Sequence, residues 1–181
     1  MIVIGIGNPG TKYERNRHNV GKLFAQYWAD SIAREENHDV RWVHGYSKLF
    51  QSAKIGATHS DPTLIVTETF MNDSGRAVQS ILKQYTGSAA SDLYVAHDDL
   101  DIALGSFKID LARGPKLHNG LGSVESHLHT EQFYRIRIGV DARPAGERIP
   151  GEAYVLHDFL DEEEPTLHRV FTEIIARLGA K

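Results

Sequence analysis

Apolar residues follow two spacings along the chain, one typical of strands and the other typical of helices. Short apolar or alternating runs predict strands at residues 2–6, 41–43, 46–55, 64–67, 93–96, 106–111 and 134–140. Apolar residues that recur every three or four positions predict helices within residues 23–32, 77–85, 121–128 and 167–178. Because strands and helices alternate, the pattern favours an α/β fold, a three-layer sandwich in which helices flank a central sheet.

Turn and cap signals mark several boundaries between these elements. Pro165 and Gly179 stand at the two ends of the last helical pattern, and the acidic run 161–164 is expected at its N-terminus, where the helix dipole favours carboxylates. Residues 142–151, ARPAGERIPG, are the most loop-like segment, but nothing marks them as a linker between domains. Since there is no internal repeat, we expect residues 1–181 to form a single domain.

Composition and charge limit the classes of protein to consider. The 181 residues contain no cysteine, which excludes disulfides, thiolate zinc sites and cysteine nucleophiles. The apolar runs are too short to span a bilayer and the N-terminus does not have the pattern of a signal peptide, so we expect a soluble cytoplasmic protein. The net charge of −4 argues against bulk nucleic-acid binding, although 20 Lys and Arg leave room for a local basic face.

The segment GIGNPG, residues 5–10, has the glycine spacing of a dinucleotide-binding turn but lacks its context. Such a turn needs a following helix with an apolar face and an acidic residue after the second strand. Here Pro9 removes a backbone N–H, the polar TKYERNRHN follows Gly10, and residues 40–43 end in His44. We interpret the glycines as a tight turn at the carboxyl end of the first strand, the edge where open α/β sheets bind ligands.

Polar side chains able to do chemistry follow three of the predicted strands. Asn8 follows the first strand, Asn72 follows residues 64–67, and Asp98 follows residues 93–96. If these strands are parallel, the three side chains meet at one rim. His18 lies in the polar loop after the first strand, and Asn119 begins a later helix. Taken singly, the asparagines could be turn or cap residues, Asp98 a solvated loop acid and His18 a surface residue, but five on one predicted rim favour a site.

One histidine, one aspartate and several amides suit a hydrolase that needs neither a metal nor a covalent intermediate. Histidine can take a proton from water near neutral pH. A carboxylate on its other nitrogen fixes the tautomer and stabilises the imidazolium. Asparagine amides can donate hydrogen bonds to a carbonyl or to a developing oxyanion.

The aspartates of HDDLD also raise the alternative of a metal-dependent phosphoester hydrolase. Asp98, Asp99 and Asp101 could contribute oxygen ligands, and the chain contains 10 His. However, the sequence contains no H-E-x-x-H, and His127 and His129 form only an H-x-H pair without an evident third ligand. We therefore expect neither a catalytic metal nor another cofactor.

Five separated segments together give a more specific signal. They are GIGNPGTKYERNRHNVG (5–21), TETFMNDSGRAV (67–78), VAHDDLDIALG (95–105), LHNGLGSV (117–124) and FYRIRIGV (133–140). Their order and spacing resemble the bacterial-type peptidyl-tRNA hydrolase family, and weaker similarity continues through residues 154–164. The resemblance implies a monomeric α/β fold with a mixed, mostly parallel sheet. It also implies cleavage of the ester that joins a peptide to the 3′ adenosine of tRNA.

The resemblance further assigns roles to individual residues. His18 matches the catalytic base of the family, Asp98 the acid that holds and polarises it, and Asn8 the residue that separates N-blocked from free aminoacyl substrates. The substrate-binding positions are matched by Tyr13, Phe70, Met71, Asn72 and Asn119, and the positions linked to tRNA phosphates by Lys108 and Arg137. Peptidyl-tRNA is thus the expected partner, with no membrane and no obligate protein partner.

Four residues at three sites depart from the family pattern. Asn16 stands where the family usually has Thr, Lys116-Leu117 replace a Gly pair, and Asp110 replaces a second residue that is often basic. The lost positive charge is expected to weaken phosphate contacts and their salt dependence. These changes keep open the alternative of a non-catalytic, hydrolase-like RNA-binding or RNA-processing module. They also suggest a divergent source, for which an organellar matrix is the alternative compartment.

Overall fold

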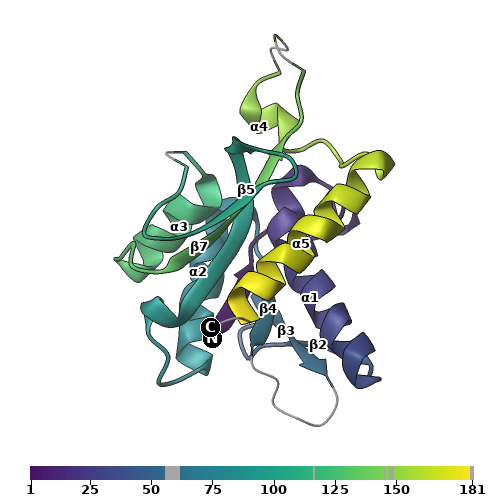
Figure 1. Cartoon of the computed structure of the whole chain (residues 1–181). Helices are drawn as coiled ribbons and strands as arrows, with labels where there is room; N and C mark the ends of the chain where they lie inside the picture. Colours follow the sequence, from purple (N-terminus) through teal and green to yellow (C-terminus); the bar gives the residue numbers. More distant parts are fainter. Residues whose placement is uncertain (56–61, 116, 145, 147–148, 180–181) are drawn as a thin grey trace.

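The computed structural model describes residues 1–55, 62–115, 117–144, 146 and 149–179. Within them, seven strands form one sheet (Figure 1). The strands are β1 (Ile2–Gly5), β2 (Val40–His44), β3 (Phe50–Ile55), β4 (Thr63–Thr67), β5 (Leu93–Ala103), β6 (Phe107–Leu111) and β7 (Tyr134–Asp141). Their order across the sheet is β2-β3-β4-β1-β5-β7-β6.

The sheet is parallel at its centre and antiparallel at both edges. Strands β4, β1, β5 and β7 run parallel to their neighbours in this group, whereas β2–β3, β3–β4 and β6–β7 pair in antiparallel fashion. The mixed sheet with a parallel core is the one that the family resemblance implies. Parallel pairing matters for function because it brings the carboxyl ends of β1, β4 and β5 to one edge.

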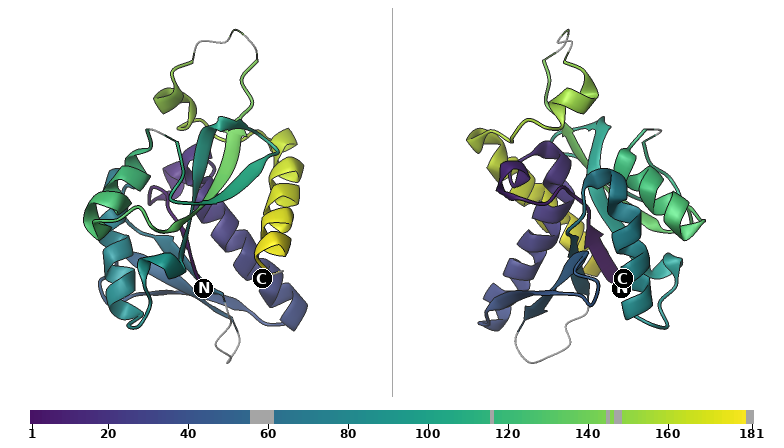
Figure 2. Two further views of the ribbon diagram at one scale, coloured as in Figure 1. Left: turned by 60° about the vertical axis from the view of Figure 1, so that its left-hand side comes forward. Right: turned by 180° about the vertical axis from the view of Figure 1, so that it is seen from behind.

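Helices cover both faces of the sheet, which confirms the three-layer prediction (Figures 1 and 2). Helices α1 (Val20–Glu36) and α5 (Glu164–Gly179) lie on one face, and α2 (Ser74–Gln84) and α3 (Asn119–Leu128) lie on the other. The short α4 (Gly151–Tyr154) stands beyond one end of the sheet. Alternation along β1 sends Val3 into the core beneath α1 and Ile4 into the core beneath α2. Among the described residues, no helix is both long and apolar enough to cross a membrane.

Two strand predictions differ from the structure. Residues 46–49, predicted as part of a strand, form a turn in which Lys48 has a positive φ, so β3 begins only at Phe50. Strand β5, predicted to end at Ala96, continues to Ala103. Its neighbour β1 ends opposite Ala96, but β7 still pairs with β5 at Asp98 and Asp99. Hydrogen bonding on this one side keeps β5 extended, so Asp98 lies in the strand, beyond the end of β1.

Two glycines allow α1 to begin directly against the sheet. A Cβ added to Gly21 would lie 2.1 Å from the carbonyl oxygen of Ala96, and one added to Gly5 would lie 2.2 Å from the carbonyl oxygen of Gly21. No side chain fits at either position without moving backbone. The first glycine of GIGNPG therefore serves a helix–strand contact, which brings the residues just before α1 to the end of β5.

Candidate active site

A cleft of about 770 Å³ opens at the carboxyl ends of the parallel strands. Its lining includes Asn8, His18, Phe70, Met71, Asn72, Asp98 and Asn119, all singled out from the sequence. These residues come from the segments that follow β1 and β4, from β5 and from the start of α3. A smaller cavity of about 290 Å³ lies between α1 and α5 and contains none of them. The predicted convergence on one rim is present in the structure.

His18 and Asp98 are in direct contact although 80 residues separate them in the chain. The Nδ1 of His18 lies 2.7 Å from Oδ1 of Asp98, and the side chains are 13% and 4% exposed. The backbone N–H of His18 donates to the carbonyl of Val155, which fixes the segment. Because a carboxylate only accepts hydrogen bonds, Nδ1 carries the hydrogen, and neutral His18 keeps its lone pair on Nε2.

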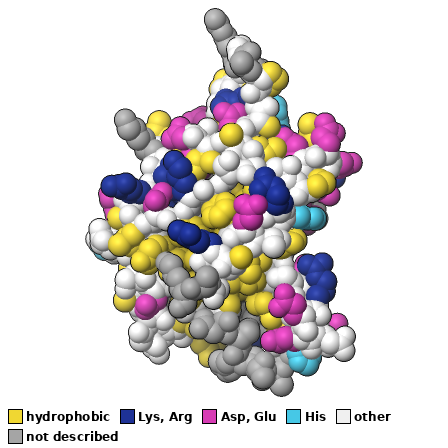
Figure 3. All heavy atoms as spheres, in the orientation of Figure 1, with side chains coloured by type: hydrophobic (Ala, Val, Ile, Leu, Met, Phe, Trp, Pro, Cys, Tyr) yellow, Lys and Arg dark blue, Asp and Glu magenta, His cyan; other side chains and the backbone are white. Residues whose placement is uncertain are grey.

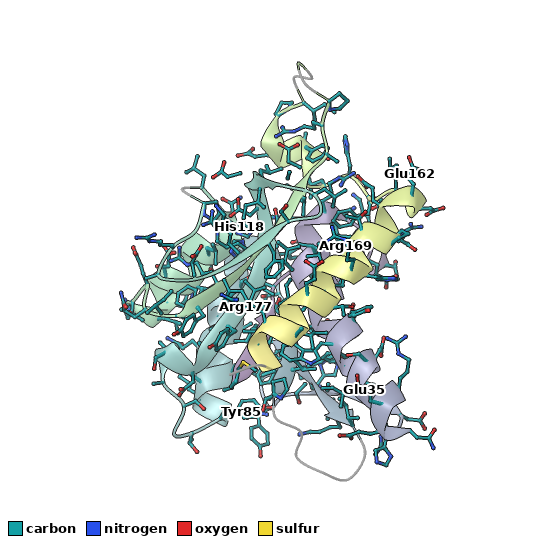
Figure 4. All side chains as sticks on the ribbon, viewed as in Figure 1. Glu35, Tyr85, His118, Glu162, Arg169 and Arg177 are labelled. Atoms are coloured by element: carbon teal, nitrogen blue, oxygen red, sulfur yellow. The ribbon has the colours of Figure 1, made fainter. Side chains whose placement is uncertain are left out.

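His118, which the sequence analysis did not single out, contacts the same carboxylate. Its Nε2 lies 2.9 Å from Oδ1 of Asp98, and its Nδ1 caps α3 by accepting the backbone N–H groups of Gly120 and Leu121 (Figure 4 labels His118). Since Nδ1 accepts from two donors, the hydrogen of the neutral ring sits on Nε2 and is donated to Asp98. The available signal was its position directly before a predicted helix, where a side chain can cap.

Asp98 therefore accepts hydrogen bonds from two imidazoles at one oxygen. Burial by itself raises the pKa of the Asp98 carboxyl, but His118 and then His18, through charge and hydrogen bonding, lower it well below its usual value. The group stays a carboxylate at neutral pH. It can orient His18 and stabilise that ring when it is protonated.

By spacing alone, the same three residues could hold a metal ion. One ligand atom from each of His18, Asp98 and His118 lies within 4.8 Å of the others. A metal would need the lone pair of Nε2 of His118, which would move its hydrogen to Nδ1, against the backbone N–H groups of Gly120 and Leu121. The cap of α3 thus favours a hydrogen-bonded cluster over a metal centre.

A third histidine lies behind this cluster. His97 is fully buried, its Nδ1 donates to the backbone carbonyl of Asp98 over 2.7 Å, and its ring stands edge-on to that of His118, with centroids 5.0 Å apart. Burial, with a smaller contribution from the charge of His118, lowers the pKa of His97 to about 3. His97 is therefore neutral in the folded protein at neutral pH.

Asn8 is held so that only one of its polar groups faces outward. Its backbone N–H and carbonyl are both bonded to the side chain of Asn19, and its Oδ1 accepts the backbone N–H of Met71 over 2.9 Å. Among the described residues, the Nδ2 group has no partner. Asn8 can therefore offer hydrogen-bond donors to a ligand, but its oxygen is already used.

The remaining predicted cleft residues lie around the mouth. Phe70 is 56% exposed, and the ring of Tyr13 meets it edge-on with centroids 6.4 Å apart. Asn72 and Asn119 are exposed at the starts of two helical segments, η3 (Met71–Asp73) and α3. Two amides and an aromatic edge thus face the same cleft from different elements.

Two of the sequence departures lie near this cleft. Asn16 is buried, and its Nδ2 donates to Oδ1 of Asp158 over 2.5 Å, so the amide ties the segment of His18 to the chain before α5. Leu117 is 93% exposed and lines the cleft. Lys116, the other half of the replaced pair, lies outside the described residues.

The two predicted phosphate-binding residues stand directly opposite each other on β6 and β7. Lys108 is exposed, whereas Arg137 is mostly buried and bonded to two carboxylates. Its Nε donates to Asp99 over 2.8 Å and its Nη1 donates to Asp110 over 3.0 Å. Burial by itself lowers the pKa of Arg137, but the hydrogen bonds to Asp99 and then Asp110 raise it above its usual value.

The fold and the cleft define an α/β protein with a histidine–aspartate centre, an arrangement suited to activating water for hydrolysis. The family model of peptidyl-tRNA hydrolase matches residues 2–180, and the chain belongs to this family. It is 34% identical to the peptidyl-tRNA hydrolase of Synechococcus sp. (strain CC9311), over 96% of this chain and 82% of that protein. It is 37% identical to that of Geobacillus kaustophilus, over 93% and 85%.

Solved structures show the same relationship. The crystal structure of peptidyl-tRNA hydrolase from Acinetobacter baumannii superposes with a TM-score of 0.78 at 25% identity, covering 98% of this chain and 86% of that one. A variant of that enzyme gives a TM-score of 0.80 at 26% identity, covering 97% and 84%. The resemblance stated from the five sequence segments is confirmed.

Proposed function

We propose that this chain hydrolyses the ester bond between peptide and tRNA in peptidyl-tRNA and so releases free peptide and free tRNA. The observation that carries the proposal is the 2.7 Å contact between Nδ1 of His18 and Asp98 inside the cleft. This contact leaves Nε2 of His18 as a base. Membership of the peptidyl-tRNA hydrolase family supports the choice of substrate.

The reaction needs one base and one leaving group. Nε2 of His18 takes a proton from a water molecule, whose oxygen attacks the ester carbonyl to form a tetrahedral intermediate. The charge of Asp98 stabilises the imidazolium that results. When the intermediate collapses, the bond to the ribose 3′ oxygen breaks and the imidazolium returns its proton to that oxygen. Because Asp98 also accepts from His118, its carboxylate does not turn away from His18.

The amides around the cleft account for recognition of an N-blocked peptide. Because Oδ1 of Asn8 is occupied by Met71, its Nδ2 is left to donate to an acceptor such as a peptide carbonyl. Asn72 and Asn119 can supply donors to the developing oxyanion. The edge-on pair of half-buried Tyr13 and exposed Phe70 fits a nucleobase near the scissile ester.

A non-catalytic RNA-binding module is the weaker reading. Binding RNA does not require a histidine whose tautomer is set by a carboxylate that a second histidine also holds. We also propose that residues 1–181 act as one domain, as a monomer in the cytoplasm, without an obligate protein partner. Light scattering on the purified chain tests the oligomeric state.

Hydrolysis of N-acetylaminoacyl-tRNA by purified wild type, His18→Ala and His44→Ala tests the activity. His44 is an exposed residue on β2 and serves as the matched control. We expect His18→Ala to abolish hydrolysis while tRNA binding persists, and His44→Ala to behave as wild type. Near-full activity of His18→Ala would overturn the assignment of the base. Activity that survives an excess of chelator is expected, since no step uses a metal.

A further inference from the structure

The guanidinium of Arg137 lies between two carboxylates that differ in burial. The Asp99 side chain is fully buried, whereas that of Asp110 is 30% exposed, and the arginine side chain itself is 13% exposed. Asp99 belongs to the sheet interior on β5, and Asp110 belongs to the edge strand β6. The Asp99 contact therefore anchors Arg137, while the Asp110 contact lies toward solvent, where another anion can compete for it.

An acidic partner also neutralises Arg135, a second buried cation on β7. Arg135, opposite Asp110 in the β6–β7 register, donates to Glu125 over 2.7 Å. Lys108 and Arg113 are exposed and make no ion pair with a described residue. On the face shown in Figure 3, basic side chains are likewise scattered among acidic ones. The cationic surface near the cleft is thus smaller than the sequence suggests.

We propose that Asp110 determines the affinity for tRNA by occupying the donors of Arg137 that would otherwise bind a backbone phosphate. This inference rests on the proposed function for its ligand. A carboxylate and a phosphate present the same kind of oxygen acceptor to an arginine, so the two compete for one guanidinium. Asp110 is covalently part of β6 and is present at high local concentration, so tRNA must displace it or bind without Arg137.

The chemical step does not depend on this competition. The bonds of Arg137 go to Asp99 and Asp110, and among the described residues it makes no hydrogen bond or ion pair with His18 or Asp98. Asp110 therefore acts on the binding of tRNA and leaves the His18–Asp98 pair unchanged. Substitution of Asp110 should therefore change KM and the salt dependence of binding.

The test measures binding of uncharged tRNA to wild type, Asp110→Asn, Arg137→Gln and the double variant over a range of salt concentrations. We expect Asp110→Asn to bind about tenfold more tightly. We also expect the fall of log affinity with log salt to become steeper, by about the contribution of one phosphate contact. Arg137→Gln should remove this gain, so that the two substitutions are coupled in a double-mutant cycle. With N-acetylaminoacyl-tRNA, KM should fall while kcat stays within about twofold of wild type.

Asp101→Asn is the matched control because it removes an exposed aspartate charge whose side chain is not bonded to Arg137. An equal gain in Asp101→Asn, or a gain in Asp110→Asn that survives Arg137→Gln, would overturn the inference in favour of a general charge effect. Unchanged affinity in folded Asp110→Asn and in folded Asp110→Ser would also overturn it. Because uncharged tRNA is the ligand, lack of hydrolysis by wild type would contradict the proposed function without affecting this result.

Discussion

Asp98 and Asp99 are neighbours on β5, and both are almost completely buried, but their partners give them different chemistry. Asp98 accepts from the imidazoles of His18 and His118, whereas Asp99 accepts from the guanidinium of Arg137. An imidazole gains and loses a proton near neutral pH, and a guanidinium does not. Burial of an aspartate therefore does not identify a catalytic group. The partner decides, and only Asp98 has a partner with a second nitrogen in the cleft.

The largest expected difference between the two aspartates is in turnover. Asp98→Asn removes the negative charge that stabilises the imidazolium of His18, and it puts an N–H donor in a group that has only acceptors in the wild type. We expect kcat to fall by about 10³- to 10⁴-fold. Asp99→Asn should change kcat far less. Single-turnover hydrolysis of N-acetylaminoacyl-tRNA measures both, and similar losses in the two variants would show that the partners of the two aspartates do not decide their roles.

For stability, substitution of Asp99 should have the larger effect of the two aspartates. Asp99→Asn breaks a buried ion pair and leaves Arg137 with only the partly exposed Asp110, so we expect the free energy of unfolding to fall by about 3 kcal/mol. Urea unfolding followed by circular dichroism measures it. The exposed Asp101→Asn is the control and should stay within about 0.5 kcal/mol of wild type. A loss as small as that of the control would show that Asp99 does not anchor the arginine.

The response of stability to pH should come from buried His97, whose Nδ1 is bonded to the carbonyl of Asp98 and whose ring lies against His118. Its pKa is about 3 in the folded protein against an ordinary 6.5. Below pH 6.5 the unfolded chain binds a proton that the folded chain excludes, so stability falls as pH falls toward 3. The slope is about 1.4 kcal/mol per pH unit.

His97→Asn keeps a donor for the carbonyl of Asp98 but does not titrate, so its stability should fall less steeply. Urea unfolding at pH 7, 6 and 5 gives the slopes. At these pH values most carboxyl groups remain ionised, so they contribute little to the slope. Identical slopes for wild type and His97→Asn would contradict the assignment of this acid sensitivity to His97.

The smallest effect separates the two roles of His118, as a donor to Asp98 and as the cap of α3. In His118→Asn the amide oxygen can still cap α3, but the donor to Asp98 is lost, so kcat should fall about tenfold with little change in stability. In His118→Gln a donor can still reach Asp98, but the cap is lost, so stability should fall by about 1 kcal/mol. Kinetics and unfolding on both variants check the pair. If both variants lose only stability, His118 does not position Asp98.

Much of the site could be predicted from local sequence patterns. Strands of short apolar runs, followed at once by Asn8, Asn72 and Asp98, place those residues at one edge because parallel strands share a direction. The five family segments add His18 and its role. The extent of β5 could not be predicted this way, since it depends on pairing with β7 beyond the end of β1.

The contacts that set protonation and charge could not be predicted from local sequence patterns. In the sequence, His118 is an ordinary residue before a predicted helix. In the structure, its ring both caps α3 and donates to Asp98. The sequence suggests that Arg137 is a free cation, whereas the structure shows that Asp99 and Asp110 accept its hydrogen bonds. Both cases involve partners on different strands or helices, which no local spacing reveals.

The sequence by itself determined the α/β class, the order of most elements, the family and the rim at which His18, Asp98 and the asparagines meet. These follow from local periodicity and from motifs in which neighbouring residues carry the information. Only the tertiary structure decided which ring nitrogen holds each proton, which aspartate serves the cleft, and which arginine is already neutralised. Those properties depend on distances of about 3 Å between residues far apart in the chain, where hydrogen bonds and charges act.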